Sequence, residues 1–214
     1  MTKPEKVDFV IETLEKIYPE VKPALNHWDP YTLLVAVALS AQTTDKKVNE
    51  ITPILFDIAD NPFKMAGLQP EEIKELISGI GLTNTKSKNL QLMAQQLIDR
   101  HQGIVPNSFI ELEALAGVGH KTASVVMAQA FDVPAFPVDT HIHRLMWRWN
   151  LSNGKNVEQT EKDAKRLFPK ELWNKLHLQI IYYGREYSPA RGFRIEKDII
   201  TRTIGRKSFV KNFI

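Results

Sequence analysis

One lysine in this sequence has the surroundings of a nucleophile. Lys121 follows Gly117-Val118-Gly119-His120 in the stretch LAGVGHKTA, just before an apolar run that is typical of a helix. The helix macrodipole disfavours a cation in the first turn, and we expect partial burial to disfavour it further. The amine is therefore predicted to be neutral part of the time, and a neutral amine can form a Schiff base. The alternative is an ordinary surface lysine.

An aspartate in the stretch FPVDTHIHR is the second candidate for chemistry. Asp139 follows an apolar segment that contains two prolines, and a helix is expected to begin after it. Its carboxylate suits an N-cap, and an N-cap can also be a catalytic carboxylate, so both roles stay open. His141 and His143 are of the type that binds metals. Residues two apart on a helix do not share a face, however, so we expect no metal site.

The two glycines before Lys121 indicate a turn between two helices. Gly117 and Gly119 allow the backbone to approach another molecule closely. The N–H groups at the start of the following helix lack helical partners and carry a partial positive charge, which suits a phosphate. A hairpin of this kind binds the sugar–phosphate backbone of DNA and does not read the bases. A weaker form of the same pattern occurs in ISGIGLTNTKSKNL.

The elements that position these residues are expected to be helices throughout. Apolar residues recur at helical spacing and no strand pair is indicated, so the fold class is predicted to be all-α. Pro53 is expected to kink its helix or end it early. The expected helices cover residues 4–18, 30–42, 46–59, 70–81, 84–103, 112–117, 121–131, 139–150, 156–169 and 170–186.

The composition narrows the class of protein. The chain has 214 residues, 43% of them hydrophobic, which is enough for one domain or two small ones. It contains no cysteine, which excludes disulfides, a thiolate nucleophile and cysteine-held metals or clusters. The longest apolar run, Leu33 to Leu39, is too short to span a membrane, and the first residues are polar. We therefore expect a soluble intracellular protein that does not bind membranes.

The positive charge is concentrated near the end of the chain. Residues 185–214 hold eight basic and three acidic side chains, a charge of +5 against +3 for the whole chain. This distribution indicates a local surface that contacts phosphates, although a solvated terminal helix is an equally good interpretation.

Taken together, these motifs resemble the helix-hairpin-helix DNA glycosylases, and within them endonuclease III. The resemblance covers most of the chain and includes LSAQTTDKKVNE, IGLTNTKSKNL, the hairpin, VDTHIHR, GKNVEQTEK and HLQIIYYGRE. It implies two helical lobes with a DNA-binding cleft between them. Residues 22–133 would form a helical barrel lobe with the helix-hairpin-helix at about 108–131. Residues 1–21 and 134–214 would form the second lobe.

The resemblance also implies an activity and a set of site residues. The protein is expected to be a bifunctional DNA glycosylase and AP lyase of base excision repair that acts on oxidised pyrimidines in duplex DNA. Lys121 would be the nucleophile and Asp139 its acidic partner, while Gln42, Leu82 and His141 would fill the gap left by a flipped base. The full set of expected DNA contacts is Gly117, Val118, Gly119, His120, Thr122, Gln42, Leu82, His141, Arg144, Lys155, Arg191 and Arg194. We expect a monomer that is cytoplasmic and associated with the nucleoid, if the chain is bacterial.

The sequence departs from the family pattern at two places. Ala116 stands where the family usually has proline. Endonuclease III typically carries four C-terminal cysteines that hold a [4Fe–4S] cluster, and here these positions are Ser188, Ile195, Asp198 and Ile204. We therefore expect no cofactor. Packing of residues such as Tyr187, Phe193 and Ile195 is expected to hold the basic tail, in which Arg202, Arg206 and Lys207 would also partly face DNA.

Three other functions are compatible with parts of this sequence pattern. A mismatch adenine glycosylase of the same superfamily usually lacks the lysine and has a catalytic glutamate, but no acidic residue lies between Asp29 and Asp45. A DNA-binding homologue without activity would have no need to retain both Lys121 and Asp139. A glycosylase with another target, such as uracil or thymine opposite guanine, stays open because the shape of the base pocket sets the target.

Overall fold

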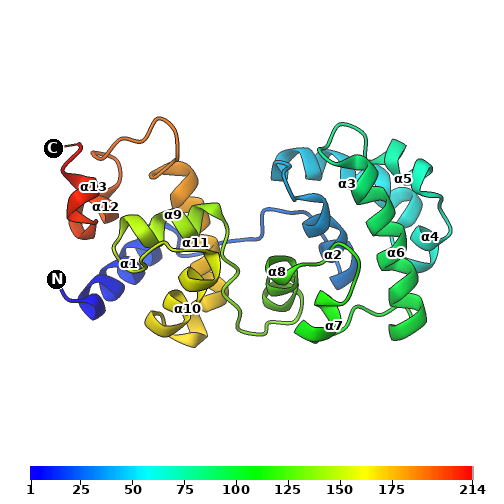
Figure 1. Ribbon diagram of the computed structural model, residues 1–214, viewed down its shortest axis with the longest axis horizontal. Helices are drawn as coiled ribbons and strands as arrows, with labels where there is room; N and C mark the ends of the chain where they lie inside the picture. The colour runs from blue at the N-terminus through cyan, green and yellow to red at the C-terminus, as the bar shows by residue number, and fades with distance from the viewer. Residues whose placement is uncertain (214) are drawn as a thin grey trace. The chain divides into compact units, whose positions relative to one another are not determined.

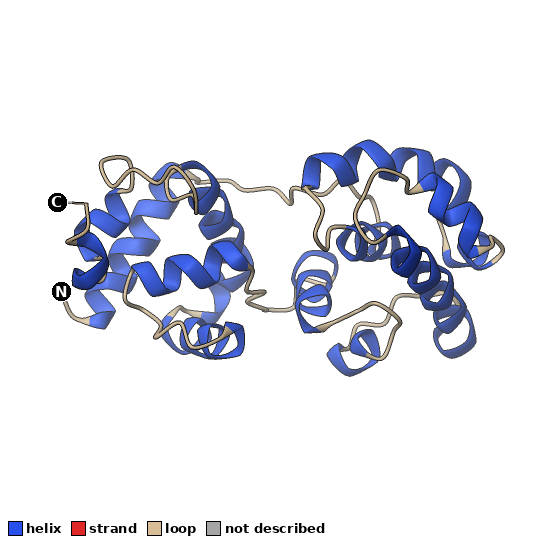
Figure 2. Cartoon of the chain, turned by 45° about the horizontal axis from the view of Figure 1, so that its top comes forward, coloured by secondary structure: helices blue, strands red, loops and turns tan. Residues whose placement is uncertain are grey.

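The computed structural model describes residues 1–213, and all regular secondary structure in that range is helical (Figure 2). The prediction of an all-α fold is confirmed. The chain divides into two compact units. Unit 1 consists of Met1–Lys22 and Pro134–Ile214, and unit 2 of Pro23–Val133. No helix within residues 1–213 has the length and apolar character needed to cross a membrane.

Unit 2 is built around a helix that is apolar on nearly all sides. This helix, α2, buries almost every side chain, and Asp29 caps it by accepting from the N–H of Thr32 at 2.7 Å. α2 packs against α8, and α6 packs against α4 and α5 (Figure 1). The helices of unit 2 are α2 (Pro30–Leu39), α3 (Asp45–Ala59), α4 (Pro62–Ala66), α5 (Pro70–Leu76), α6 (Thr83–His101), α7 (Phe109–Glu113) and α8 (His120–Ala130).

Unit 1 joins the first helix of the chain to its last third. α1 packs against α11 and α12, and the largest fully buried side chains of its core are Trp149, Tyr183 and Phe136. A 3₁₀ turn, η1 (Lys170–Leu172), precedes α11. The α-helices of unit 1 are α1 (Lys3–Ile17), α9 (Thr140–Arg148), α10 (Val157–Leu167), α11 (Trp173–Glu186), α12 (Ile199–Ile204) and α13 (Lys207–Val210).

The observed helices differ from the expected ones in several places. The helix expected at residues 70–81 ends at Leu76, and the helix expected at residues 112–117 lies at Phe109–Glu113, with Ser108 as its N-cap. α3 continues past Pro53 to Ala59 and does not end early. Pro53 is exposed, and buried residues on both sides of it, such as Ile51 and Leu55, hold the helix to the core. The short helices α4, α12 and α13 are also absent from the expected set, since four to six residues carry too little periodicity to be recognised.

A buried histidine makes the stability of the protein depend on pH. His177 of α11 is 1% exposed, and its Nδ1 lies 3.2 Å from the carbonyl oxygen of Trp173. Its Nε2 has no hydrogen-bond partner within residues 1–213. Burial lowers the pKa of His177 to about 4, so the ring is neutral in the folded protein at neutral pH.

We expect the folded state to lose stability as pH falls from about 6.5 to 4, because only the unfolded chain binds a proton at His177 in that range. The shift corresponds to about 3 kcal/mol. His177→Asn should reduce the acid-dependent loss by a similar amount, measured by urea unfolding at pH 6.5, 5 and 4. Identical pH dependence in the variant and the wild type would contradict this assignment.

Candidate active site

The turn before Lys121 requires glycine at one position and leaves open space at another. Gly117 has φ +76°, and a Cβ there would lie 2.9 Å from Nδ2 of Asn89. A larger residue is therefore disfavoured both by the backbone and by contact with α6. A Cβ at Gly119 would meet nothing within 4 Å, and Gly119 is the N-cap of α8. Because glycine has no side chain, nothing at position 119 caps the start of α8, and a ligand can approach the backbone there closely.

Helix α6 holds this turn from behind. The N–H of Ala116 donates to Oε1 of Gln96 at 2.7 Å, and Asn89 packs under Gly117. Proline at position 116 would remove the N–H that makes this bond. Ala116, which stands where the family usually has proline, therefore makes a hydrogen bond to α6 that a proline could not make. Sequence reasoning missed Asn89 and Gln96, because nothing in their local sequence indicates contact with a loop some twenty residues away.

Lys121 lies in the first turn of α8, as predicted. Its side chain is exposed, so the expectation of partial burial is wrong. The physical reason is its position just after an open turn, where no other element of unit 2 covers it. Its neighbour His120 is also exposed. Nδ1 of His120 lies 2.7 Å from Oε1 of Glu113 in α7, and the His120 ring stacks on Phe109. These contacts fasten α7 to the start of α8.

Asp139 is the N-cap of α9. Its Oδ1 accepts a hydrogen bond from the N–H of Ile142 at 2.8 Å, which confirms the predicted cap. The side chain is only partly buried, and the cap bond engages Oδ1 but not Oδ2. Asp139 belongs to unit 1 and Lys121 to unit 2. The catalytic role of the aspartate stays a prediction.

Gln42 and Leu82 lie on two neighbouring loops of unit 2 and share an uncommon backbone conformation. Their φ values are +55° and +62°, in the left-handed region that costs a residue other than glycine roughly 1–2 kcal/mol. A Cβ on Gly81 would lie 3.4 Å from the carbonyl oxygen of Gln42, so the loops are adjacent. Both side chains are exposed, and Leu82 is one of the exposed large apolar residues of the chain. Strain at exposed residues is typical of functional sites.

His141 and Arg144 form a connected pair in unit 1. Nη2 of Arg144 lies 3.0 Å from Nδ1 of His141 and also donates to the carbonyl oxygens of Gly184 and Ser188 at 3.1 and 2.9 Å. Because a guanidinium only donates, Nδ1 of His141 accepts. Burial lowers the pKa of His141, and Arg144 lowers it further, against an opposing effect of Asp139. His141 is therefore neutral at neutral pH. That these two residues contact DNA stays a prediction.

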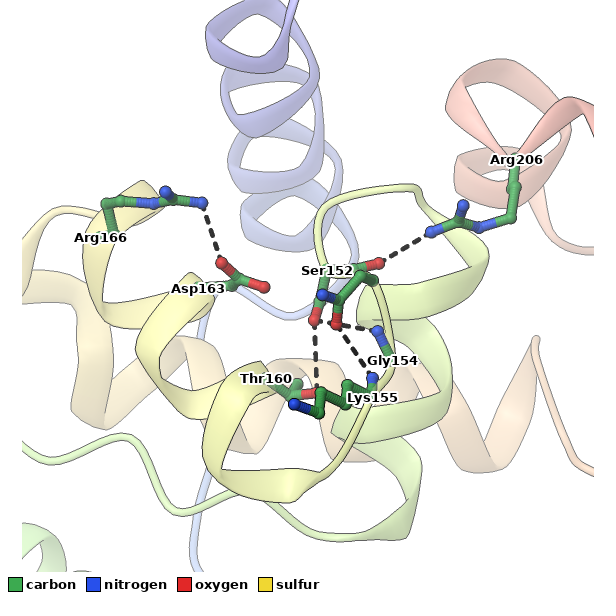
Figure 3. Close-up of polar contacts among 8 residues, drawn as sticks. Ser152, Gly154, Lys155, Thr160, Asp163, Arg166 and Arg206 are labelled. Carbon is green, nitrogen blue, oxygen red and sulfur yellow. Dashed lines mark hydrogen bonds and ion pairs between the residues drawn. The ribbon is translucent and has the colours of Figure 1, made fainter.

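Lys155 extends from a loop of unit 1 that is held by several hydrogen bonds (Figure 3). The hydroxyl of Ser152 accepts from the N–H of Gly154 at 3.3 Å, and its carbonyl oxygen accepts from Arg206 at 2.8 Å. The N–H of Lys155 donates to Oδ1 of Asn153 at 2.9 Å. The side chain of Lys155 is exposed, so a hydrogen-bonded loop presents a cation to solvent. Arg206, expected in part to face DNA, uses its guanidinium to hold this loop.

A buried arginine organises the loop after α11. Arg148 is 6% exposed, and its Nη1 donates to the hydroxyl and carbonyl oxygens of Ser188 at 2.8 and 3.1 Å. Its guanidinium carbon lies 4.2 Å from the ring centre of Phe193 and 4.9 Å from that of Phe209. Planar guanidinium groups bind well between carbonyl oxygens and aromatic faces. The loop that carries Arg191 and Arg194 is therefore anchored to Arg148 at Ser188, near its start, and at Phe193, in its middle.

Comparison with known proteins decides the family. Residues 35–170 match the family model described as HhH-GPD superfamily base excision DNA repair protein. Endonuclease III of Escherichia coli K12 is 40% identical over 200 residues, which is 94% of this chain and 94% of that protein. The chain belongs to the endonuclease III family. Endonuclease III of Bacillus subtilis is 38% identical over 191 residues, which is 89% of this chain and 87% of that protein.

A solved structure supports the same assignment. It is described as a trapped endonuclease III–DNA covalent intermediate, and it superposes on this chain with a TM-score of 0.93 at 34% identity. The match covers 99% of this chain and 100% of that one. The resemblance drawn from the sequence motifs is therefore confirmed at the level of family and fold. The roles of the individual site residues are not tested by these comparisons.

This member of the endonuclease III family has no side chains that fit an iron–sulfur cluster at the expected positions. The hydroxyl of Ser188 accepts a hydrogen bond from Arg148. Asp198 is fully buried, and its Oδ1 accepts a hydrogen bond from the hydroxyl of Tyr183 at 2.8 Å. Ile195 and Ile204 are apolar and buried. Because such clusters are held by cysteine thiolates and the chain has no cysteine, the residues present do not fit the group.

Proposed function

We propose that this chain is a bifunctional DNA glycosylase and AP lyase that removes oxidised pyrimidines from duplex DNA. Membership of the endonuclease III family supports base excision repair as the process. The observation that carries the finer proposal is Lys121, an exposed amine in the first turn of α8 directly after a glycine turn. A related structure described as a trapped covalent intermediate with DNA agrees with a nucleophilic mechanism.

In the proposed reaction, Nζ of Lys121 attacks C1′ of the damaged nucleotide. The bond between C1′ and the base nitrogen breaks, and the base leaves with its bonding electrons and takes up a proton. The attacking nitrogen then loses a proton, and the C1′–O4′ bond breaks with its electrons leaving on O4′, which takes up a proton, so that the opened sugar is a protonated Schiff base. The Schiff base acidifies the proton on C2′. Removal of that proton expels the 3′ phosphate by β-elimination and cuts the strand.

Asp139 is proposed to supply the negative charge that this reaction requires. Its carboxylate would stabilise the positive charge that develops on the sugar and assist proton transfer from Lys121. Oδ2 is the oxygen assigned to this role, because Oδ1 accepts the cap bond from Ile142. Since the amine belongs to unit 2 and the carboxylate to unit 1, both units would have to bind the same DNA.

The glycine turn and the two strained loops are assigned to DNA binding. The backbone N–H groups around Gly119 are suited to a phosphate, because they open onto free space at the start of a helix. Gln42 and Leu82 are adjacent and exposed, so they are suited to replace a base that has left the stack. Enzymes that act on a base take it out of the duplex first, and the gap must then be filled.

We expect the wild-type protein to release an oxidised pyrimidine from duplex DNA and to cut the strand, and Asp139→Asn to be slower by at least ~10²-fold. Asparagine caps a helix nearly as well as aspartate, so thermal stability should change little. Single-turnover rates on duplexes that carry thymine glycol (an oxidised pyrimidine), uracil or thymine opposite guanine, or an abasic site, measure both the target and the effect.

The wild type on undamaged duplex is the control for this panel. Preference for uracil or for thymine opposite guanine would replace the proposed target with another glycosylase activity. A protein that binds the lesion duplexes but neither releases a base from them nor cuts them would contradict an enzymatic function. If Asp139→Asn has full activity and reduced stability, Asp139 serves only as a helix cap.

The anchored basic loop is expected to contact DNA phosphates. Arg191 and Arg194 are exposed, and each phosphate contact contributes about 0.9 to the slope of log affinity against log salt. Replacing both with alanine should lower the slope by up to about 2. Binding should weaken equally on damaged and undamaged DNA, because backbone contacts carry no information about the base. Fluorescence anisotropy over a range of salt concentrations measures the slope.

The matched control for this pair replaces Lys162 and Lys170, two exposed cations of the same unit, with alanine. It removes the same charge and should leave the slope close to that of the wild type if the contacts are local. Equal slopes for the wild type and the Arg191 and Arg194 variant would identify the loop as solvated surface.

A further inference from the structure

One lysine of unit 2 is buried without taking part in the proposed chemistry. Lys86 lies in the first turn of α6 and is 7% exposed, which is unusual for a lysine. Burial lowers the pKa of its amine, so the folded protein bears a cost for keeping it there. A group that is costly to bury and still retained in the core needs an explanation beyond packing.

The ammonium group of Lys86 binds a single short segment. Its Nζ donates to the carbonyl oxygens of Leu39 and Ala41 at 2.9 and 2.6 Å and to Oγ1 of Thr43 at 3.0 Å. These acceptors come from the last residue of α2 and from the loop that follows it. The three donors of the ammonium thus meet three oxygens on both sides of Gln42, and a cation is favoured at the carboxyl end of a helix.

The backbone of the same lysine binds the second loop. The N–H of Lys86 donates to the carbonyl oxygen of Leu82 at 2.9 Å, which closes the first turn of α6. Lys86 therefore bonds the residues flanking Gln42 through its side chain and bonds Leu82 itself through its main chain. The loops also touch directly at Gly81 and Gln42. Both loops hold a residue with positive φ, a conformation that persists only where the surroundings fix it.

We propose that Lys86 is a positioning residue that holds Gln42 and Leu82 together as one rigid wedge. This inference rests on the proposed function, in which the two side chains fill the gap left by a flipped base. Lys86 has no contact with the reacting atoms in this account. Its ammonium fixes the loop of Gln42 relative to the start of α6, so that both side chains enter the DNA at a set spacing.

The test compares two substrates that differ in their need for a wedge. The first is a duplex with thymine glycol opposite adenine, from which the base must be flipped. The second is a single-stranded oligonucleotide with an abasic site, which has no stacked gap to fill. Lys86→Met keeps the length of the side chain and removes the donors. We expect its single-turnover rate to fall by at least about tenfold on the duplex, as expected for misplaced positioning groups, and by less than about twofold on the single strand.

Two further variants make the result specific. Lys88→Met removes an exposed lysine of the same helix and should behave as the wild type on both substrates. Thr43→Val keeps the ammonium and removes one of its three acceptors, so it should lower the duplex rate alone by a smaller factor. It also keeps the test valid if Lys86→Met does not fold, which far-UV circular dichroism would reveal.

The outcomes separate this inference from the proposed function. A wild type that is inactive on both substrates overturns the proposed function, and the inference with it. If the wild type is active, equal losses on the two substrates would make Lys86 a general structural residue. No loss on the duplex in either folded variant would equally overturn its role in positioning the wedge.

Discussion

One face of α6 supports every part of unit 2 that is assigned to DNA. Along this face, Leu82 is the N-cap, the side chain of Lys86 donates to the loop around Gln42, and Asn89 packs under Gly117. These positions are spaced so that they share one side of a helix. A rigid helix thus fixes the spacing between two strained loops and the turn that precedes Lys121. A shift of α6 would therefore move the wedge and the hairpin together.

In unit 1, side chains hold the loop after α11 in a chain whose residues do not fit a metal cluster. The loop after α11 lacks regular structure up to α12, and arginine side chains hold its first residues through the carbonyl oxygen of Ser188. Phe193 and Phe209 cover the guanidinium of Arg148. Carbonyl oxygens, a buried cation and aromatic rings thus organise this loop in a chain that has no thiolates. The exposed arginines of the loop are presented from an ordered base.

Features that depend on neighbouring residues could be predicted from the sequence, and features that depend on distant ones could not. The start of α8 and the cap at Asp139 follow from local patterns and are confirmed. The bond between Ala116 and Gln96 and the contacts of Lys86 with residues 39–43 join separate segments, so no local pattern indicates them. Exposure of Lys121 was misjudged for the same reason, since burial depends on which elements cover a residue.

The central claim is that the amine of Lys121 forms the covalent bond to DNA. The most direct measurement is borohydride reduction of the wild-type protein on a duplex with an oxidised pyrimidine, followed by proteolysis and mass spectrometry of the linked peptide. The account predicts a sugar adduct on Lys121 and loss of that adduct in Lys121→Ala, which should still bind the duplex. An adduct on another lysine, or undiminished trapping by Lys121→Ala, would contradict it.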